Sequence, residues 1–459
     1  MDFTVADQFR NMRIHFESAV TRPYAFRKKQ LAALRDSLLQ HEDEIYAALY
    51  ADLKKSREEA YATELGLVLG ELNLALRRLR EWMEPITVPT DLVNFPSHSR
   101  IYKDPLGVVM IISPWNYPLQ LLLNPLVGAI AGGNCAVIKP SEHAPATAAL
   151  VTKIITGIFP AEYVFVLNGP GKETIPAALH AFRFDHLFYT GSTMVGRELY
   201  QLAAAQLVPV TLELGGKSPC IVEHDADIPL AAKRIILGKF SNAGQTCIAP
   251  DYILAHQSIK SQLIAEMKKA IEKCYTGTPA TSPDYGRIIH RDQFRRLMKY
   301  MEDGQVVHGG AANEEDLFIE PTLLDNVSPQ SPLMREEIFG PLLPVLAYQS
   351  TEEAMQIVKR NEQPLALYLF TANRKMMNEW IAQVPFGGGC INNTVWQFSN
   401  HLLPFGGVGK SGMGAYHGPY SFQAFTRLKP VLHTPNWFDA WLKYPPFAGR
   451  LKIFKWLIR

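Results

Sequence analysis

The run Val108-Val109-Met110-Ile111-Ile112 decides the fold. Five consecutive apolar residues, four of them β-branched, are typical of a strand that is buried on both faces. Similar short apolar runs follow at 136–138, 163–166 and 186–189, with helical periodicity between them. Strands that alternate with helices predict an α/β fold with a doubly wound parallel sheet, in which ligands bind beyond the carboxyl ends of the strands.

Distinctive sequences follow three of these strands. Ser113-Pro114-Trp115-Asn116 follows the first, Lys139-Pro140-Ser141-Glu142 the second, and Thr190-Gly191-Ser192-Thr193-Met194-Val195-Gly196 the fourth. In the last of these, two glycines open a predicted helix whose N-terminal amides suit a pyrophosphate, and Ser192 is placed to cap it. The Gly-x-x-x-x-Gly spacing also fits an ordinary turn. A binding site is favoured because this turn, like the two other sequences, directly follows a predicted strand.

Two further motifs carry candidate chemistry. The glycine-marked turn Phe240-Ser241-Asn242-Ala243-Gly244-Gln245-Thr246-Cys247 ends on a cysteine, and Leu212-Glu213-Leu214-Gly215-Gly216 places a glutamate in an apolar run. A free thiol has a pKa of roughly 8.5, so we expect a reactive cysteine to have surroundings that favour its anion. Apolar neighbours raise the pKa expected for Glu213, which suits a general base. Each motif alone also fits a structural role, as an inert buried cysteine or a paired carboxylate.

Together, and in this order, the two motifs resemble the signatures of the aldehyde dehydrogenase superfamily. The resemblance extends over nearly the whole chain. It implies that Cys247 attacks an aldehyde to give a thiohemiacetal, whose oxyanion is held by the Asn116 amide. It also implies that hydride passes to a nicotinamide, leaving a thioester that water activated by Glu213 hydrolyses to a carboxylic acid.

The same resemblance assigns the residues that hold the cofactor. Lys139 and Glu337 are similar to the residues that bind the two riboses, and Phe339 to one that packs near the nicotinamide ribose. Glu142 resembles an acid that disfavours a 2′-phosphate, so NAD is expected, and NADP stays possible because a flexible carboxylate can swing aside. Lys139 with Glu142 also fits a solvated loop pair, and Glu337 a helix start. The expected cofactor residues are Lys139, Ser141, Glu142, Gly191, Ser192, Gly196, Glu337 and Phe339.

Length and composition describe a soluble globular protein of two or three domains. The chain has 459 residues, of which 47% are hydrophobic and 20% charged, and its formal charge of +2 gives no indication of a nucleic-acid partner. We expect a dinucleotide-binding domain over 1–82 and 104–213 and a second α/β catalytic domain over 214–389. The segments 83–103, read as a protruding β-hairpin, and 390–459 are expected to bridge protomers.

The cysteines and the N-terminus indicate a reducing, cytoplasmic location. Five scattered cysteines without Cys-x-x-Cys spacing argue against a disulfide framework and against a zinc site, so no metal is expected. The first residues carry early acidic side chains and no apolar core typical of a signal peptide. No apolar run reaches the roughly 20 residues that a membrane-spanning helix needs.

Within the superfamily the chain most resembles class 3, the group that includes the fatty aldehyde dehydrogenases. It starts directly in the first helix and carries Gly414-Ala415-Tyr416-His417-Gly418 and Tyr444-Pro445-Pro446-Phe447. The resemblance implies a homodimer that exchanges the hairpin and the C-terminal region. It also implies medium- or long-chain aliphatic or aromatic aldehydes as substrates.

The segment 449–459 is basic and amphipathic if helical. Leu451, Phe454 and Leu457 share one face, while Lys452 and Lys455 lie on the opposite one. It could lie on a membrane surface, cover a substrate tunnel, or dock on its own dimer.

Two other functions stay open. A coenzyme A-acylating aldehyde dehydrogenase would replace water by a thiol and would not need Glu213. A catalytically inactive binding or structural relative is opposed by the joint presence of Cys247, Glu213 and Asn116.

Overall fold

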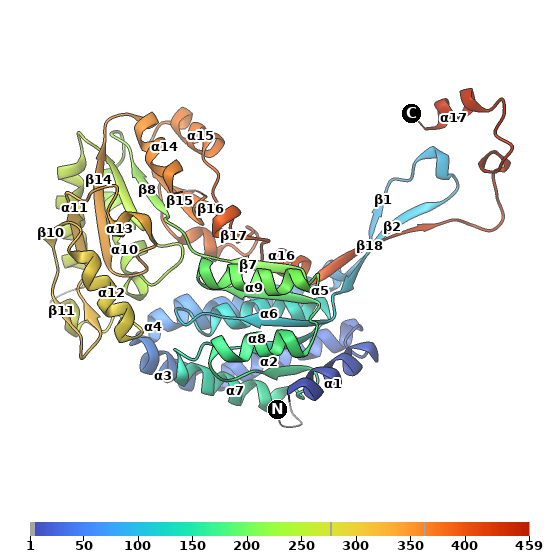
Figure 1. Ribbon diagram of the computed structural model, residues 1–459, viewed down its shortest axis with the longest axis horizontal. Helices are drawn as coiled ribbons and strands as arrows, with labels where there is room; N and C mark the ends of the chain where they lie inside the picture. The colour runs from blue at the N-terminus through green and yellow to red at the C-terminus, as the bar shows by residue number, and fades with distance from the viewer. Residues whose placement is uncertain (1–4, 276–277, 362, 459) are drawn as a thin grey trace.

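The computed structural model describes residues 5–275, 278–361 and 363–458. Two sheets covered by helices form the body of the molecule, and a three-stranded sheet projects from it together with the C-terminal segment (Figure 1). The predicted class is confirmed: doubly wound, mostly parallel sheets in two α/β units, with an additional β-element outside them.

The first sheet contains the four strands predicted from sequence. Its order is β17-β7-β6-β3-β4-β5, with β17 antiparallel to β7 and the other neighbours parallel. All five residues of the deciding run are buried. The strands are β3 (Val108–Ile112), β4 (Cys135–Lys139), β5 (Val164–Val166), β6 (His186–Thr190), β7 (Val210–Glu213) and β17 (Gly412–Met413).

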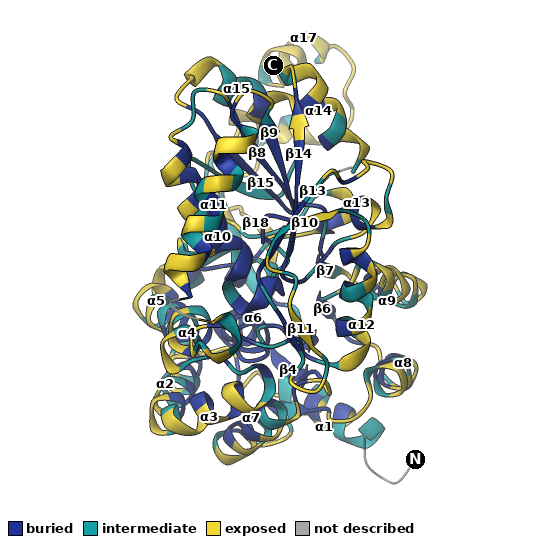
Figure 2. Ribbon diagram, turned by 90° about the vertical axis from the view of Figure 1, so that its left-hand side faces the viewer, coloured by how far each residue is buried: buried dark blue, intermediate teal, exposed yellow. Residues whose placement is uncertain are grey.

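Helices cover both faces of this sheet, as Figure 2 shows by the buried strands between partly exposed helices. Four of the helices connect successive strands, and the N-terminal helices pack against them. The helices are α1 (Val5–Glu17), α2 (Tyr24–Gln40), α3 (Glu42–Leu53), α4 (Arg57–Ala60), α5 (Gly66–Met83), α6 (Gln120–Gly132), α7 (Pro145–Ile158), α8 (Gly171–Ala181) and α9 (Thr193–Ala205), with a π-helical turn at Tyr61–Leu65.

The apolar residues from Leu31 to Leu49 recur with the period of a single helix face, but they belong to two helices. The chain breaks at His41, between α2 and α3. The acidic run Glu42-Asp43-Glu44 follows the break, and carboxylates favour a new helix N-terminus because of the helix dipole. The apolar residues nevertheless remain buried in one core.

The second sheet has the order β10-β13-β14-β9-β8-β15-β16, in which β10 is antiparallel to β13 and the other neighbours are parallel. A separate small pair, β11 (Ala312–Asn313) and β12 (Phe318–Ile319), lies beside it. The remaining elements are β8 (Pro219–Val222), β9 (Tyr252–His256), β10 (Gln305–His308), β13 (Thr322–Asp325), β14 (Leu342–Tyr348), β15 (Ala366–Phe370), β16 (Gly388–Ile391), α10 (Ile228–Phe240), α11 (Lys260–Cys274), α12 (Arg291–Met301), α13 (Pro332–Arg335), α14 (Thr351–Arg360) and α15 (Arg374–Gln383).

Each large sheet has its own hydrophobic core. Fully buried leucine and isoleucine side chains dominate both, and each contributes roughly 1.5–3 kcal/mol to folding. The C-terminal segment joins the first core through Tyr416, Phe422 and Phe425. The last part of the chain therefore helps to build the first α/β unit.

The projecting sheet contains the predicted hairpin and a third strand from the C-terminal region. The strands β1 (Ile86–Val88) and β2 (His98–Pro105) pair with each other, and β18 (Thr426–His433) pairs along the whole of β2. The helix α16 (Pro419–Ala424), packed on α6, precedes β18, and α17 (Leu451–Leu457) lies near the chain end.

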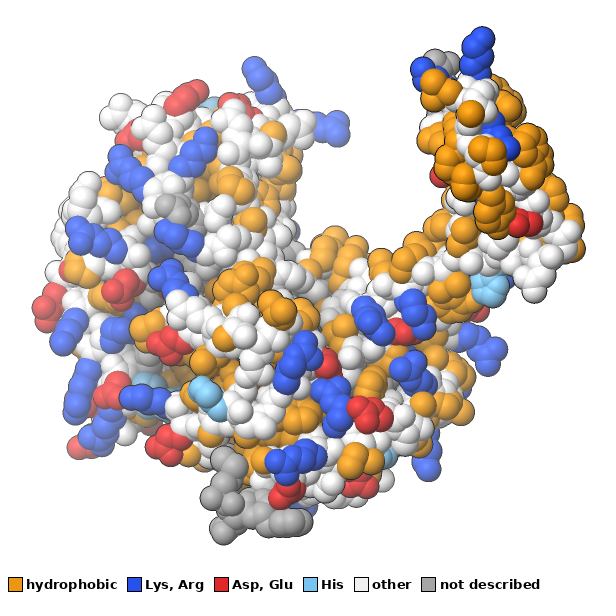
Figure 3. All heavy atoms as spheres, turned by 45° about the vertical axis from the view of Figure 1, so that its right-hand side comes forward, with side chains coloured by type: hydrophobic (Ala, Val, Ile, Leu, Met, Phe, Trp, Pro, Cys, Tyr) orange, Lys and Arg blue, Asp and Glu red, His pale blue; other side chains and the backbone are white. Residues whose placement is uncertain are grey.

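This projecting arm, β1, β2 and residues 426–458, exposes many hydrophobic side chains (Figure 3). Trp437, Trp441 and Trp456 are 76%, 66% and 70% exposed, so the single chain leaves large aromatic surfaces without a covering partner. Among the described residues, no helix has both the length and the apolarity needed to cross a bilayer.

Candidate active site

A cleft of about 790 Å³ lies where the carboxyl ends of the first sheet face the second α/β unit. The sequences that follow β3, β4 and β6 all reach it, as the strand-end argument predicts. The second unit closes it with the cysteine turn and the segment after α13. The predicted site residues that line this cleft are Asn116, Lys139, Glu142, Gly191, Ser192, Glu213, Cys247, Glu337 and Phe339.

A second cavity of about 620 Å³ meets this cleft at Cys247. Its lining is mostly apolar and comes from α4 to α6, from α10 and α11, and from residues 395–417. Six aromatic side chains contribute to the wall: Tyr117, Tyr275, Trp396, Phe398, Phe405 and Tyr416. The thiol therefore lies at the junction of a polar cleft and an apolar cavity.

The turn that carries Cys247 has an unusual backbone held by many hydrogen bonds. Asn242 and Ala243 have positive φ angles of 51° and 52°, and Gly244 follows at 75°. A side chain at Gly244 would collide with the carbonyl oxygen of Gly340, so only glycine fits. The Gln245 side chain donates to the carbonyls of Asn242 (3.0 Å) and Arg287 (2.9 Å). The turn is thereby fixed before it reaches the thiol.

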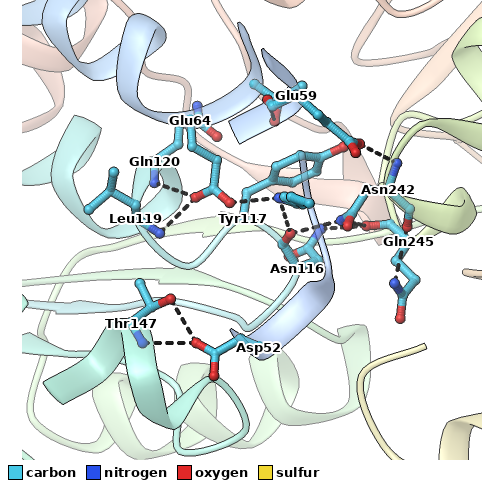
Figure 4. Close-up of polar contacts among 12 residues, drawn as sticks. Asp52, Glu59, Glu64, Asn116, Tyr117, Leu119, Gln120, Thr147, Asn242 and Gln245 are labelled. Atoms are coloured by element: carbon cyan, nitrogen blue, oxygen red, sulfur yellow. Dashed lines mark hydrogen bonds and ion pairs between the residues drawn. The ribbon is translucent and has the colours of Figure 1, made fainter. Parts of the chain in front are cut away.

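Asn116 is anchored directly to this turn (Figure 4). The Asn116 side-chain nitrogen donates to the backbone carbonyl of Gln245 at 3.0 Å. The backbone carbonyl of Asn116 accepts from the Asn242 side-chain nitrogen at 2.8 Å. An amide nitrogen carries two N–H groups, and the described contacts occupy one of them. The second N–H is left for a ligand in the cleft that Asn116 lines.

Glu213 ends β7 with a buried carboxyl group. Neither of its oxygens has a hydrogen-bond partner among the described residues, and burial raises its pKa well above the usual range. Glu337 is a second buried carboxyl in the cleft, and burial, with a smaller contribution from Asp251, raises its pKa to about 8. In both groups burial therefore favours the protonated carboxyl over the carboxylate.

The electrostatics around Cys247 differ from the sequence expectation of surroundings that favour the thiolate. Burial is the main cause that raises the pKa of the Cys247 thiol, and Glu337 and Glu213 raise it further. These surroundings favour the neutral thiol over the thiolate.

Lys139, predicted to bind a ribose, and Glu142, predicted to disfavour a 2′-phosphate, form a connected group after β4. The Lys139 ammonium, buried, donates to Glu142 and to the Pro140 carbonyl at 3.0 Å. The other Glu142 oxygen accepts from the Gly171 amide at 2.7 Å. Burial opposes ionisation of Glu142, but the hydrogen bonds from Lys139 and Gly171 outweigh it and lower its pKa. The carboxylate lines the cleft, although 36% of the Glu142 side chain is exposed.

The glycine turn after β6 forms a helix start, as expected. Ser192 caps α9 by accepting from the Val195 amide at 3.4 Å, and Gly191 lines the cleft. Two predicted cofactor residues do not line the cleft. Gly196 packs against Leu214, where a Cβ would collide, and Ser141 accepts from the His143 amide within its own loop.

The cleft lining also includes Trp115, His143 and His290, which are not among the predicted site residues. Trp115 packs edge-to-face on Phe339 with ring centroids 5.3 Å apart, and the rings of His143 and His290 lie 5.0 Å apart in the same cleft. Trp115 lies inside the strand-end sequence that we selected for Asn116, so its position could have been predicted. The two histidines meet only through the fold.

Comparison with known proteins identifies the class of enzyme and then the family. Residues 4–431 match the family model described as the aldehyde dehydrogenase family. The chain is 45% identical to the 4,4′-diaponeurosporen-aldehyde dehydrogenase of Staphylococcus aureus (strain NCTC 8325 / PS 47) over 98% of both proteins. It is 43% identical to the dimeric NADP-preferring aldehyde dehydrogenase of Canis lupus familiaris, over 97% of this chain and 99% of that protein.

A solved structure described as the substrate-bound state of Staphylococcus aureus AldH superposes with a TM-score of 0.98, at 44% identity, over 99% of this chain and 100% of that one. The molecule is thus an oxidoreductase that uses NAD or NADP to oxidise aldehydes to carboxylic acids. The chain belongs to the aldehyde dehydrogenase family. Its relatives include family 3 members such as member A2 of Macaca fascicularis, 43% identical over 93% of this chain and 87% of that one, in agreement with the class 3 resemblance.

Proposed function

We propose that this protein oxidises medium- or long-chain aliphatic or aromatic aldehydes, with Cys247 as the nucleophile. The observation that carries the proposal is the position of the thiol, at the junction of a polar cleft and an apolar cavity of about 620 Å³. The apolar wall favours a large hydrophobic aldehyde over a short one because burial of apolar surface contributes to binding. The Staphylococcus aureus relative is named a 4,4′-diaponeurosporen-aldehyde dehydrogenase.

The covalent step begins with a thiolate. Cys247 loses its proton to a carboxylate base or to solvent, and the sulfur attacks the carbonyl carbon to form a thiohemiacetal. The free N–H of Asn116 then donates to the oxyanion, and removal of such a donor typically costs about 10²–10³ in kcat. NAD or NADP, when bound, would supply the acceptor for the hydride that leaves the thiohemiacetal carbon, and Cys247 would then hold the carbon as a thioester.

Glu213 removes a proton from the water that hydrolyses this thioester. Its carboxyl has no hydrogen-bond partner among the described residues, which leaves both oxygens available to a water molecule in the cleft. The raised pKa makes the carboxylate a stronger base once it is ionised. The acid product then leaves and the thiol is restored.

The cleft residues fit a nicotinamide dinucleotide. The capped N-terminus of α9 at Gly191 and Ser192 suits the pyrophosphate, while Lys139 and Glu337 would bind the riboses. Phe339 would pack near the nicotinamide ribose, beside Trp115. Ser141 and Gly196 would act indirectly, by shaping the loop and by packing α9.

NAD is the proposed first cofactor. The Glu142 carboxylate, held by Lys139 and Gly171, would face a 2′-phosphate and repel it. NADP remains an alternative because the dog relative is named NADP-preferring. Release of the carboxylate would leave the Lys139 ammonium to meet the phosphate.

The alternative function is coenzyme A-acylation, and product analysis separates the two. We expect short-chain, long-chain and aromatic aldehydes, each assayed with NAD and NADP, to yield free acids, with the larger aldehydes giving the higher kcat/KM. Addition of coenzyme A should not divert the product. Formation of acyl-coenzyme A would support the alternative, and cofactor binding without any oxidation would indicate an inactive binding relative.

The proposed domain division follows the elements. Residues 1–82 and 104–213 would form the dinucleotide-binding domain and 214–389 the catalytic domain. The segments 83–103 and 390–459 would bridge two protomers of a homodimer, although 412–413 add β17 to the first sheet. The exposed aromatic residues of the arm support such a partner contact, and the dog relative is named dimeric.

We propose that the protein is cytoplasmic and that its segment 449–459 contacts a membrane surface or covers the aldehyde cavity. Its exposed Trp456 and Ile453 and the charges of Lys452 and Lys455 suit an interface between water and lipid. We expect deletion of 449–459 to abolish sedimentation with anionic vesicles or to change the chain-length profile of kcat/KM. The charge-reversed pair Lys452→Glu with Lys455→Glu should lose the vesicle binding alone. If the deletion changes neither quantity, the helix is docked on its own dimer.

A further inference from the structure

A buried ion pair lies behind the proposed oxyanion site. Lys55, between α3 and α4, donates to Glu64 in the π-helical turn at 2.6 Å, and both side chains are 0% exposed. Removing two charges from water is costly and does not by itself stabilise a protein. A further role of this pair is therefore to be found in what the two side chains contact.

Lys55 reaches the backbone of Asn116. Its ammonium donates to the Asn116 carbonyl at 3.0 Å and lies 4.1 Å from the centre of the Tyr117 ring. A lysine has three N–H donors. Here two go to Glu64 and Asn116, and the ammonium also lies against the face of Tyr117.

Glu64 holds the other end of the same short segment. Its second oxygen accepts from the amides of Leu119 (2.9 Å) and Gln120 (3.2 Å), where α6 begins. The α6 N-terminus has no capping side chain of its own, so Glu64 supplies this function from a different helix. Figure 4 shows Glu64 at the Leu119 and Gln120 amides. The ion pair thus holds both ends of residues 116–120, Glu64 at one end and Lys55 at the other.

The opposite side of Asn116 is fixed by the cysteine turn. The Asn116 carbonyl is shared between the Lys55 ammonium and the Asn242 side chain, while the Asn116 amide donates to Gln245. Without the Lys55 donor, the Asn116 backbone carbonyl would keep only the hydrogen bond from the Asn242 side chain, on the side of the cysteine turn. The direction of the free Asn116 N–H in the cleft would change with it.

We propose that Lys55, together with Glu64, is a positioning residue that aims the Asn116 amide at the developing oxyanion. The proposal rests on the oxyanion role of Asn116 given above. Lys55 does not touch the aldehyde or the cofactor and acts only through Asn116. Neither residue lines the cofactor cleft.

A double-mutant cycle tests this role. We expect Lys55→Met to lower kcat roughly 10- to 100-fold, the cost of an ångström-scale misplacement, with cofactor affinity measured by fluorescence titration unchanged. In the Asn116→Ala background the same Lys55→Met change should cost little more, because the amide through which it acts is gone. Equal losses in both backgrounds would overturn the proposal. If Asn116→Ala alone leaves kcat unchanged, the oxyanion role itself fails.

Two further variants separate positioning from stability. Lys55→Met with Glu64→Gln removes both charges and retains an acceptor for the α6 amides. We expect this double variant to regain most of the thermal stability that Lys55→Met alone loses, but not the wild-type kcat. Recovery of both would show a purely structural pair. Should Lys55→Met alone not fold, the cycle with Asn116→Ala is run on this charge-neutral variant. The control Lys260→Met, which breaks a pair with Asp325 in the other unit, should leave kcat near the wild-type value.

Discussion

We expect the Cys247→Ala variant to form no NADH or NADPH from any aldehyde while it still binds the cofactor. Cys247 is the residue with a nucleophilic side chain at the junction of the cleft and the apolar cavity, so without its sulfur no thiohemiacetal forms. Loss of a covalent nucleophile typically costs about 10⁴ or more in kcat. The Gln245 and Asn242 contacts that fix the turn do not involve the thiol, so the cleft should keep its shape.

Spectrophotometric assay of cofactor reduction, together with fluorescence titration of cofactor binding, measures both parts of this expectation. The matched control is Cys135→Ala, which removes a buried thiol from β4, in the core of the first unit. This control should retain turnover. Wild-type activity in Cys247→Ala would show that another group carries the covalent step.

We expect the Glu213→Gln variant to produce a burst of reduced cofactor close to one equivalent of enzyme and then to stall. Glutamine has nearly the same shape but cannot take a proton from water, so the thioester persists on Cys247. General base catalysis typically contributes a factor of about 10²–10⁴ in rate, and we expect the steady-state rate to decrease by a factor in this range. Stopped-flow detection of the burst and mass analysis of the acylated cysteine check the result.

The pH profile adds a second readout for Glu213. Because burial raises its pKa, the carboxylate form appears only at pH values above the usual range for glutamate, and the hydrolysis rate of the wild type should rise with pH through that raised pKa. Glu213→Gln should lose this rise. The control Glu223→Gln changes another carboxyl whose pKa burial raises, beyond the end of β8, and should keep both the rate and the profile. A full steady-state rate in Glu213→Gln would assign the base elsewhere.

The sequence predicted those parts of the site that depend on local pattern. Buried strands are marked by apolar runs, and in a parallel sheet their carboxyl ends share one edge, so Asn116, Lys139 and Gly191 could be expected in one cleft before any coordinates. The Ser192 cap follows from residue type and position in the same way. The Gly191 to Gly196 pattern predicts a cofactor contact for Gly196, and it cannot show that Gly196 packs against Leu214, because that is a tertiary contact.

Other features depend on contacts between distant segments. The pairing of β18 with β2 joins residues more than 300 positions apart, and no local period indicates it. The raised pKa of the Cys247 thiol comes from burial and from two carboxyl groups of other segments, which a motif cannot show. Lys55 and Glu64 stand in an ordinary charged stretch of the sequence, and their role appears only when Asn116 is placed beside them.

The short strand β17 has a consequence for biosynthesis. It pairs with β7 so that Gly412 lies opposite Glu213, and the Ser411 carbonyl accepts from the amide of Leu214. Ribosomes make the N-terminus first, so β17 is synthesised after every other strand of the two large sheets. A nascent chain that already carries Cys247, the proposed nucleophile, thus still lacks the strand that borders Glu213, the proposed base.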